Sequence, residues 1–221
     1  MAKYKIAEKF ISINGEGRLS GQLAVFIRFC NCNLCCSFCD TKWANSTDAK
    51  EILDENEIYS FIKENNIKNV TLTGGEPLIQ ENIIDLLNLL SKDDSIHVEI
   101  ETNGSINLKP FISKNNPPSF TMDYKLPSSN MEDKMCIDNF SLLTKNDTLK
   151  FVVSNNEDLE RFYFILKKYN LKDKCNVYIS PVYGAIPLES IVEFIKDKNL
   201  NDVTMQLQIH KYIWDANKRG V

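Results

Sequence analysis

The stretch "RFCNCNLCCSFCDT", residues 28–41, places five of the seven cysteines of the chain within ten consecutive positions. Cys32, Cys36 and Cys39 have C-x3-C-x2-C spacing, and they follow the apolar run "LAVFIRF" at 23–29, which predicts a buried strand. A loop after a strand can fold such thiolates around one centre. Three thiolates can hold three irons of a [4Fe-4S] cube and leave the fourth iron open to a small molecule.

A structural zinc site is the alternative for the same loop. Zn²⁺ binds up to four thiolates, and Cys30 and Cys35 add two candidates to the three in the motif. Disulfides are less expected in a reducing compartment, and the odd number of cysteines agrees with this. Cys136 and Cys175 stand alone in the sequence, so we expect buried or inert thiols there.

Strand and helix patterns alternate along the chain. Apolar, β-branched runs predict further buried strands at 68–73, 96–101, 119–124, 148–154 and 176–180. Amphipathic segments between the runs predict helices at 54–65, 81–92, 156–169 and 187–198. This order requires crossover connections, and it predicts an α/β fold whose parallel sheet carries ligand sites at the carboxyl ends of its strands.

Two connections depart from this alternation. Residues 102–118 and 125–147 are rich in Asn, Ser, Pro and Lys, so we expect loops there and an incomplete barrel. The run "VTMQLQI" at 203–209 and the tail at 210–221 are expected to add an edge strand and a C-terminal lid. With no repeat and no linker in the sequence, we expect residues 1–221 to form a single domain.

Composition and charge exclude two classes of partner. The net charge is -4, and basic and acidic residues are interspersed, which argues against a nucleic-acid-binding surface. The first residues, "MAKYKIAEKF", lack an apolar stretch of signal-peptide length, and no run approaches the ~18 apolar residues of a membrane span. We therefore expect a cytoplasmic protein with neither a nucleic acid nor a membrane as partner.

The segment "TLTGGEPL", residues 71–78, follows the next predicted strand. Gly74 and Gly75 lack a Cβ that would keep a ligand from the backbone, Glu76 can bind an ammonium, and Pro77 ends the strand. Such a turn on its own is most often a plain strand-to-helix connection. Together with the cysteine loop it resembles the radical S-adenosylmethionine enzymes, which implies an incomplete (β/α)6 barrel. In that family the open iron binds S-adenosyl-L-methionine, and the reduced cluster cleaves it to a 5'-deoxyadenosyl radical.

Further motifs narrow the resemblance: "SINGEG" at 12–17, "IETNGS" at 100–105, "MDYKLPSS" at 122–129, "SPVYG" at 180–184 and "MQLQIHKY" at 205–212. With these, nearly the whole chain resembles the 7-carboxy-7-deazaguanine synthase family. The resemblance implies a carbon-nitrogen lyase of queuosine biosynthesis that converts 6-carboxy-5,6,7,8-tetrahydropterin to 7-carboxy-7-deazaguanine with loss of ammonia. It also implies a [4Fe-4S] cluster, S-adenosyl-L-methionine, Mg²⁺, a flavodoxin- or ferredoxin-type electron donor and a homodimer.

The resemblance assigns roles in cofactor binding. Cys32, Cys36 and Cys39 match the cluster ligands, so Cys30 and Cys35 fall outside the motif. Contacts to S-adenosyl-L-methionine are implied for Phe38, Cys39, Asp40, Gly75, Asp123, Tyr124, Lys125, Ser180, Pro181, Val182 and Tyr183.

Roles in metal and substrate binding follow in the same way. Thr41 matches a Mg²⁺ ligand, and a neutral hydroxyl suits this hard cation. Arg28 matches the residue that binds the substrate carboxylate, for which a guanidinium offers two parallel donors. Without the resemblance, Thr41 is an ordinary loop residue and Arg28 a solvated strand end. Substrate contacts are implied for Ile13, Asn14, Gly15, Arg28, Thr73 and Val221.

For several polar residues the sequence does not decide between a functional and a structural role. Glu101, in "ETNG", is either a catalytic residue that orders ribose or substrate, or a plain strand-end carboxylate. For His210 a packed imidazole is favoured over a catalytic role, and His97 has no functional case. Asn14 stands where many relatives have Gln, and "MDYK" replaces the "SPK" of others, which leaves side-chain contacts there open.

Two other functions would account for part of these motifs. Glycyl-radical-enzyme activating enzymes share CxxxCxxC and GGEP, and this alternative predicts a groove for a peptide loop. It does not account for "SINGEG" or "MQLQIHKY". A zinc-stabilised binding module is the non-enzymatic alternative, and it does not need the GGEP turn.

Overall fold

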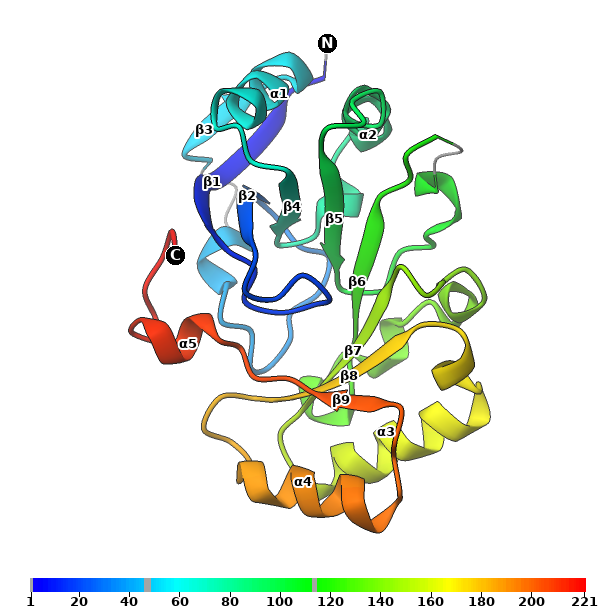
Figure 1. Cartoon of the computed structure of the whole chain (residues 1–221). Coiled ribbons are helices and arrows are strands. Elements are labelled where there is room, and N and C mark those ends of the chain that lie inside the picture. The colour runs from blue at the N-terminus through cyan, green and yellow to red at the C-terminus, as the bar shows by residue number, and fades with distance from the viewer. Residues whose placement is uncertain (1, 46–48, 113–114) are drawn as a thin grey trace.

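The computed structural model describes residues 2–45, 49–112 and 115–221, and its centre is one mixed sheet (Figure 1). The strand order is β3-β1-β2-β4-β5-β6-β7-β8-β9. All neighbours from β2 to β9 are parallel, whereas β1 pairs antiparallel with both β2 and β3. The strands are β1 Tyr4–Ile13, β2 Leu23–Phe29, β3 Glu51–Leu53, β4 Asn69–Gly74, β5 His97–Thr102, β6 Ser119–Tyr124, β7 Thr148–Val153, β8 Asn176–Pro181 and β9 Val203–Met205.

The six predicted strands are confirmed as β2 and β4 to β8, with shifts of one residue at most. They form near-continuous apolar runs because parallel strands are covered on both faces, and β7 is buried at every position. The predicted edge strand is also confirmed, although β9 ends at Met205. β1 and β3 lengthen the sheet at the opposite edge.

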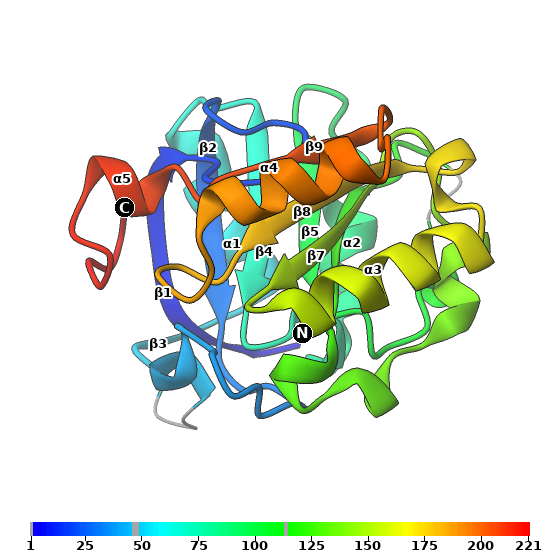
Figure 2. The same ribbon diagram turned by 90° about the horizontal axis from the view of Figure 1, so that it is seen from below.

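Each predicted helix is present within its predicted segment. The helices are α1 Glu55–Glu64, α2 Ile83–Leu90, α3 Asn156–Lys168 and α4 Leu188–Asp197, with a short α5 His210–Ile213 in the tail. Asp54 and Glu57 form a capping box that fixes the start of α1. α3 and α4 lie side by side and cover the outer face near β7 and β9 (Figure 2). In the described residues, none of these helices has the length and apolar character needed to span a bilayer.

The barrel is incomplete, as predicted, because two crossovers lack α-helices. Within the described residues, the β5–β6 and β6–β7 connections contain only 3-10 turns. The buried side chain of Asn139 replaces helical hydrogen bonds there. Its Oδ1 accepts from the Leu108 amide at 2.9 Å, and its Nδ2 donates to the Ile106 carbonyl at 2.8 Å. The sheet and these ordered loops form a partial α/β barrel.

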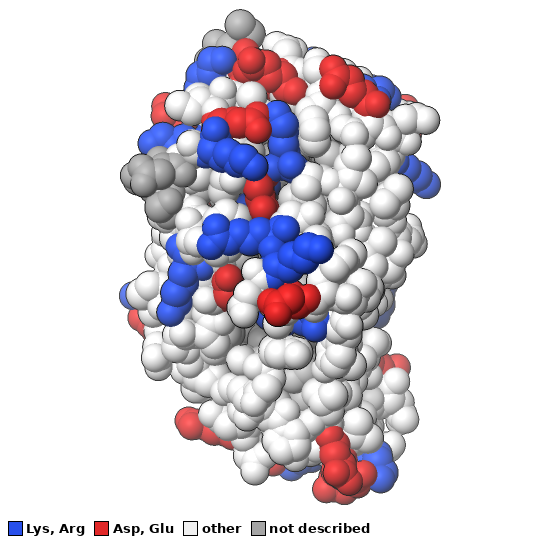
Figure 3. Space-filling view, turned by 90° about the vertical axis from the view of Figure 1, so that its left-hand side faces the viewer, with Lys and Arg blue, Asp and Glu red and all other residues white. Residues whose placement is uncertain are grey.

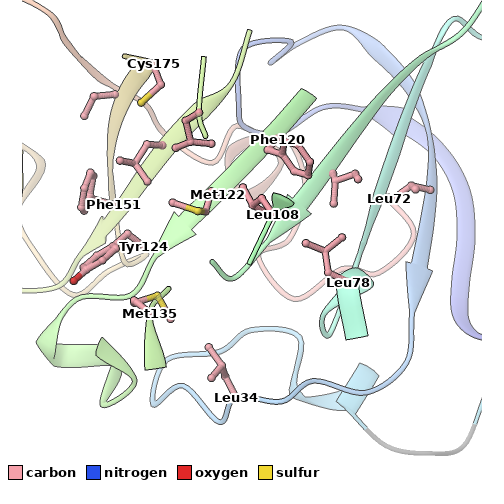
Figure 4. Close-up of a cluster of buried hydrophobic side chains, with 14 of the residues drawn as sticks. Leu34, Leu72, Leu78, Leu108, Phe120, Met122, Tyr124, Met135, Phe151 and Cys175 are labelled. Carbon is pink, nitrogen blue, oxygen red and sulfur yellow. The ribbon is translucent and has the colours of Figure 1, made fainter. Parts of the chain in front are cut away.

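The hydrophobic core anchors the cysteine loop. Figure 4 shows side chains from successive strands, such as Leu72, Met122 and Phe151, in one buried cluster. Leu34, between the first two motif cysteines, belongs to the same cluster and points toward it from the loop. Burial of a leucine side chain contributes about 1.5–3 kcal/mol, so this contact holds the loop against the end of the sheet.

Candidate active site

A cavity of about 280 Å³ lies at the carboxyl ends of the central strands, between the cysteine loop, the N-terminal hairpin loop and the C-terminal tail. This is the edge at which parallel α/β sheets bind ligands. Most of the predicted site residues line it: Ile13, Gly15, Arg28, Cys32, Cys36, Phe38, Cys39, Asp40, Thr41, Thr73, Gly75, Glu101, Asp123, Lys125, Val182, Tyr183 and Val221.

The three motif thiols share this cavity, and the other two cysteines of the loop lie outside its lining. Cys30 is buried beside Ala7 and Ala44, and Cys35 is exposed. Burial raises the pKa of both Cys32 and Cys36, and the neighbouring Cys39 thiol raises it further. A bound metal cluster would favour the thiolate form of these three residues.

The donor groups at the cavity fit a cluster with a polar ligand beside it. Within the described residues, no three His, Cys, Asp or Glu side chains surround a single ion position. A [4Fe-4S] cube takes each thiolate on a different iron, so its ligands do not need to converge on one point. Glu16 and Asp123 line the cavity, and their buried atoms Oε1 and Oδ1 have no hydrogen-bond partner in the described structure. A bound polar ligand would supply such partners.

The glycines of the GGEP turn are required by contact with the cysteine loop. A Cβ on Gly75 would lie 1.8 Å from the Asn31 carbonyl oxygen, and one on Gly74 would lie 2.3 Å from that of Phe29. Gly74 also has a φ of +142°, which a side chain would strain. The Glu76 amide donates to the Asn31 carbonyl at 2.8 Å. The turn therefore holds the start of the cysteine loop in place.

Glu76 has a structural role, and the expectation that it binds an ammonium is corrected. Its side chain is fully buried and does not line the cavity. The carboxylate accepts hydrogen bonds from Leu78 N at 3.0 Å, the Thr102 hydroxyl at 2.9 Å and Asn103 N at 2.7 Å. Burial raises the pKa of Glu76 to about 7 against these bonds. Glu76 ties the end of β5 to the GGEP turn.

The side chain of Tyr124 faces away from the cavity, so of the contacts that the sequence leaves open in this segment, the structure does not support one by this side chain. Successive residues of a strand point to opposite faces, so Asp123 and Lys125 line the cavity while Tyr124 enters the core. Its hydroxyl donates to Glu132 at 3.1 Å. Only the backbone of Tyr124 remains available to a ligand.

Three other predicted residues lie behind the cavity wall, outside its lining. Asn14 is buried, and its Oδ1 accepts from the Thr71 hydroxyl at 2.7 Å, while its Nδ2 has no partner in the described structure. Ser180 and Pro181 are buried at the end of β8. Side-chain contacts at these three positions are therefore not supported by the structure.

Sequence reasoning missed an ion-pair network at the floor of the cavity. Lys150 Nζ lies 2.8 Å from Glu16 and 3.5 Å from Asp123, which also pairs with Lys125 at 2.9 Å. Burial alone would lower the pKa of Lys150, but the acidic neighbours outweigh it and raise the pKa. The sequence signal for this network was a lysine inside a strand that is expected to be buried on both faces.

Glu8 and Glu101 complete the acidic lining. Arg28 Nε lies 2.8 Å from Glu8 Oε1, its cross-strand partner on β1. Burial raises the pKa of Glu101, and Glu16 adds to this, whereas Lys150 opposes it. Glu101 therefore lies in the cavity lining, and its catalytic role stays a prediction.

The C-terminal tail covers the cavity, in the place expected for a lid. Lys211 pairs with Asp40 of the cysteine loop at 2.7 Å, and burial alone would raise the pKa of Asp40 while Lys211 holds it below its usual value. Tyr212 packs edge-on against Tyr183 at 6.1 Å between ring centroids. Figure 3 shows Lys and Arg gathered on the face that carries the tail, with acidic side chains between them.

The base of the tail is fixed to the N-terminal hairpin loop. Gly17 and Gln206 exchange two hydrogen bonds, of 2.7 and 3.0 Å. His210 packs directly on Gly15, since a Cβ there would lie 2.1 Å from its Nδ1. Burial lowers the pKa of His210, which favours the neutral imidazole. This contact agrees with the packed histidine that the sequence favours.

Comparison with known proteins gives a consistent result. Residues 26–113 match the Radical SAM superfamily model. The chain is 60% identical to the 7-carboxy-7-deazaguanine synthase of Clostridium acetobutylicum over 99% of both chains. It is 32% identical to that of Leptospira interrogans over 99% of this chain and 98% of the relative. The crystal structure of QueE from Escherichia coli has the same fold, with a TM-score of 0.71 at 22% identity over 92% and 94% of the two chains.

Proposed function

The chain belongs to the 7-carboxy-7-deazaguanine synthase family of radical S-adenosylmethionine enzymes, and we propose that it converts 6-carboxy-5,6,7,8-tetrahydropterin to 7-carboxy-7-deazaguanine with loss of ammonia. The observation that carries this proposal is the shared cavity, which brings Cys32, Cys36 and Cys39 together with Arg28 and a covering tail. A relative 60% identical over its full length favours this reaction over the activating-enzyme and zinc-module alternatives.

Family membership implies a [4Fe-4S] cluster and S-adenosyl-L-methionine. We propose Cys32, Cys36 and Cys39 as the cluster ligands. When bound, the two groups supply one-electron cleavage of the sulfonium and hence a radical that removes hydrogen from the substrate. The residues on the cavity wall that would hold S-adenosyl-L-methionine are Phe38, Asp40, Gly75, Asp123, Lys125, Val182 and Tyr183, with Gly75 offering only its backbone.

Mg²⁺ is proposed at Thr41. The Thr41 hydroxyl lies 3.6 Å from Cys39 Sγ and lines the same cavity, so it could hold a cation beside the proposed cluster ligands. Mg²⁺ keeps several waters and takes further oxygens from its substrate, so one protein hydroxyl is a sufficient anchor. Its proposed role is to hold substrate oxygens in one arrangement.

The remaining residues orient the pterin and exclude water. Arg28 and Thr73, on neighbouring strands, face the cavity where the pterin carboxylate and ring would lie. Glu101, in the same lining, is proposed to accept a hydrogen bond from substrate or ribose. The tail over the mouth limits the access of water to a reactive radical.

The surroundings of the enzyme are proposed on the same basis. We propose that residues 1–221 act as one radical S-adenosylmethionine domain in a cytoplasmic homodimer. A flavodoxin- or ferredoxin-type donor would supply the electron. The test is anaerobic reconstitution with iron and sulfide, followed by incubation with reductant, S-adenosyl-L-methionine, Mg²⁺ and 6-carboxytetrahydropterin. Deazaguanine product is expected, and a reconstituted protein that cleaves S-adenosyl-L-methionine but forms none would contradict the assignment.

A further inference from the structure

Trp43 lies near two guanidinium groups at the mouth of the cavity. Arg219 Cζ, from the tail, is 4.2 Å from the centroid of the Trp43 ring, and Arg28 Cζ, from the end of β2, is 6.0 Å from it. All three side chains line the cavity. A guanidinium over an indole face is held by cation–π attraction, so the ring orients both groups at one place. Segments at the two ends of the sequence meet here.

The two guanidinium groups differ in their charge balance. Arg28 is largely neutralised by Glu8, since their Nε and Oε1 atoms are 2.8 Å apart and both side chains are mostly buried. Arg219 pairs with no acidic side chain within the described part of the chain. An anion entering this mouth would gain little net attraction from the Arg28–Glu8 pair alone. Arg219 supplies the additional positive charge.

Lys218 is the neighbouring cation on the tail and also lines the cavity. Within the described part of the chain its ammonium contacts neither an aromatic ring nor an acidic side chain, whereas the Arg219 guanidinium is oriented by Trp43. A planar fork of donors also matches a carboxylate better than an ammonium does. The geometry therefore favours Arg219 over Lys218 as the anion contact.

We propose that Arg219 is a specificity-determining residue that binds the carboxylate of the substrate together with Arg28. This inference rests on the proposed function and names a residue that the family motifs do not assign. Because Arg219 belongs to the tail, the tail closes over a carboxylated pterin more firmly than over a pterin without that group. Trp43 keeps the guanidinium in position before the substrate arrives.

The test compares two ligands on reconstituted protein with S-adenosyl-L-methionine and Mg²⁺ but no reductant, so that no turnover occurs. The ligands are 6-carboxytetrahydropterin and tetrahydropterin without the carboxylate. Arg219→Gln should raise the dissociation constant of the carboxylated ligand roughly tenfold and leave that of the other ligand unchanged. Arg219→Lys should recover part of the loss. Lys218→Gln, which removes the same charge one position earlier, should have a smaller effect.

A second measurement follows Trp43 directly. The chain has two tryptophans, so a Trp214→Phe background leaves Trp43 as the single emitter. The carboxylated ligand should change its emission with Arg219 present and have less effect with Arg219→Gln.

Several outcomes would overturn the inference. If Arg219→Gln weakens both ligands equally, the residue only holds the tail. If it weakens neither, the carboxylate lies elsewhere. If the parent protein fails to bind the carboxylated pterin, the proposed function fails and this inference with it. A parent that prefers the carboxylated ligand, with a variant that keeps the same preference, overturns this inference alone.

Discussion

The ammonium of Lys150 lies 2.8 Å from the carboxylate of Glu16, and this contact joins the middle of the parallel sheet to the N-terminal hairpin loop. The two residues are 134 positions apart in the sequence. Both side chains are close to nine-tenths buried. Water therefore screens the pair weakly, and each charge depends on the other.

Lys150→Met should destabilise the protein by about 3–5 kcal/mol, because it leaves buried carboxylates without their cation. The thermal unfolding midpoint of the reconstituted protein, measured without oxygen, tests this. Adding Glu16→Gln to Lys150→Met should recover part of the loss, since it removes the uncompensated charge. Lys196→Met, at an exposed ion pair of α4, is the control and should change the midpoint little. Additive losses in the double variant would contradict the pairing.

Cys36→Ala should abolish cluster assembly, because it removes one of three thiolates that face the cavity. Cys35→Ser is the matched control, since the adjacent thiol is exposed and outside the cavity lining. Iron content and visible absorbance after reconstitution distinguish the two variants. Equal losses in both would show that the cluster uses a different set of thiols.

Much of the fold could be predicted because parallel strands leave a strong local signal. Strands covered on both faces form continuous apolar runs, and the polar crossovers at 102–118 and 125–147 show where helices are missing. β1 gives a weaker signal. It carries Glu8, it has a bulge between Ile6 and Glu8, and only part of it is buried.

The candidate site could be predicted where its chemistry lies in short motifs, as in the cysteine loop and the GGEP turn. The ion pairs of Lys150 and Arg28 could not, because spacing along the chain does not show which distant charges meet. The direction of the Tyr124 side chain and the structural role of Glu76 could not be predicted for a related reason. A motif identifies the residue type at a position, but the strand pleat and the local hydrogen bonds decide what its side chain contacts.

Glu99 should make the free energy of unfolding fall as the pH rises from about 4.5 to about 7. Burial raises its pKa from 4.5 to about 7, although the Thr121 hydroxyl donates to it at 2.5 Å. A raised pKa means that the folded state keeps a proton that the unfolded state loses above pH 4.5, so stability is full below that pH and declines up to about pH 7. The loss is about 3 kcal/mol for this group alone.

Glu99→Gln should therefore flatten the pH dependence of the unfolding midpoint between about pH 5 and 8. The amide keeps a hydrogen-bond acceptor for Thr121 and cannot ionise. Glu81→Gln, at an exposed carboxylate, is the control and should leave the slope as in the parent. Parallel profiles for parent and Glu99→Gln would mean that Glu99 is already ionised in the folded protein at low pH.

Thr41→Ala should weaken the response of the rate to added Mg²⁺ while leaving iron content unchanged. The substitution removes an oxygen ligand that lies beside Cys39 and removes no sulfur ligand. Thr41→Ser keeps the hydroxyl and is the matched control. A Mg²⁺ titration of product formation decides the matter, and a Thr41→Ala curve that overlays the parent curve would place the metal elsewhere.

Arg28→Lys should weaken substrate binding far more than S-adenosyl-L-methionine binding. The guanidinium contacts Glu8 through Nε, which leaves its outer nitrogens on the cavity side for a carboxylate, whereas an ammonium cannot satisfy both partners with the same geometry. A hydrogen bond to a charged group contributes about 1.5–3 kcal/mol, so the substrate dissociation constant should rise roughly ten- to a hundredfold. The positive charge survives, and Glu8 keeps a cation beside it, so folding and cluster assembly should not suffer. Binding isotherms for both ligands on the reconstituted protein test this, with iron content as the control. Unchanged pterin affinity would mean that Arg28 serves only to neutralise Glu8 and that another cation binds the carboxylate.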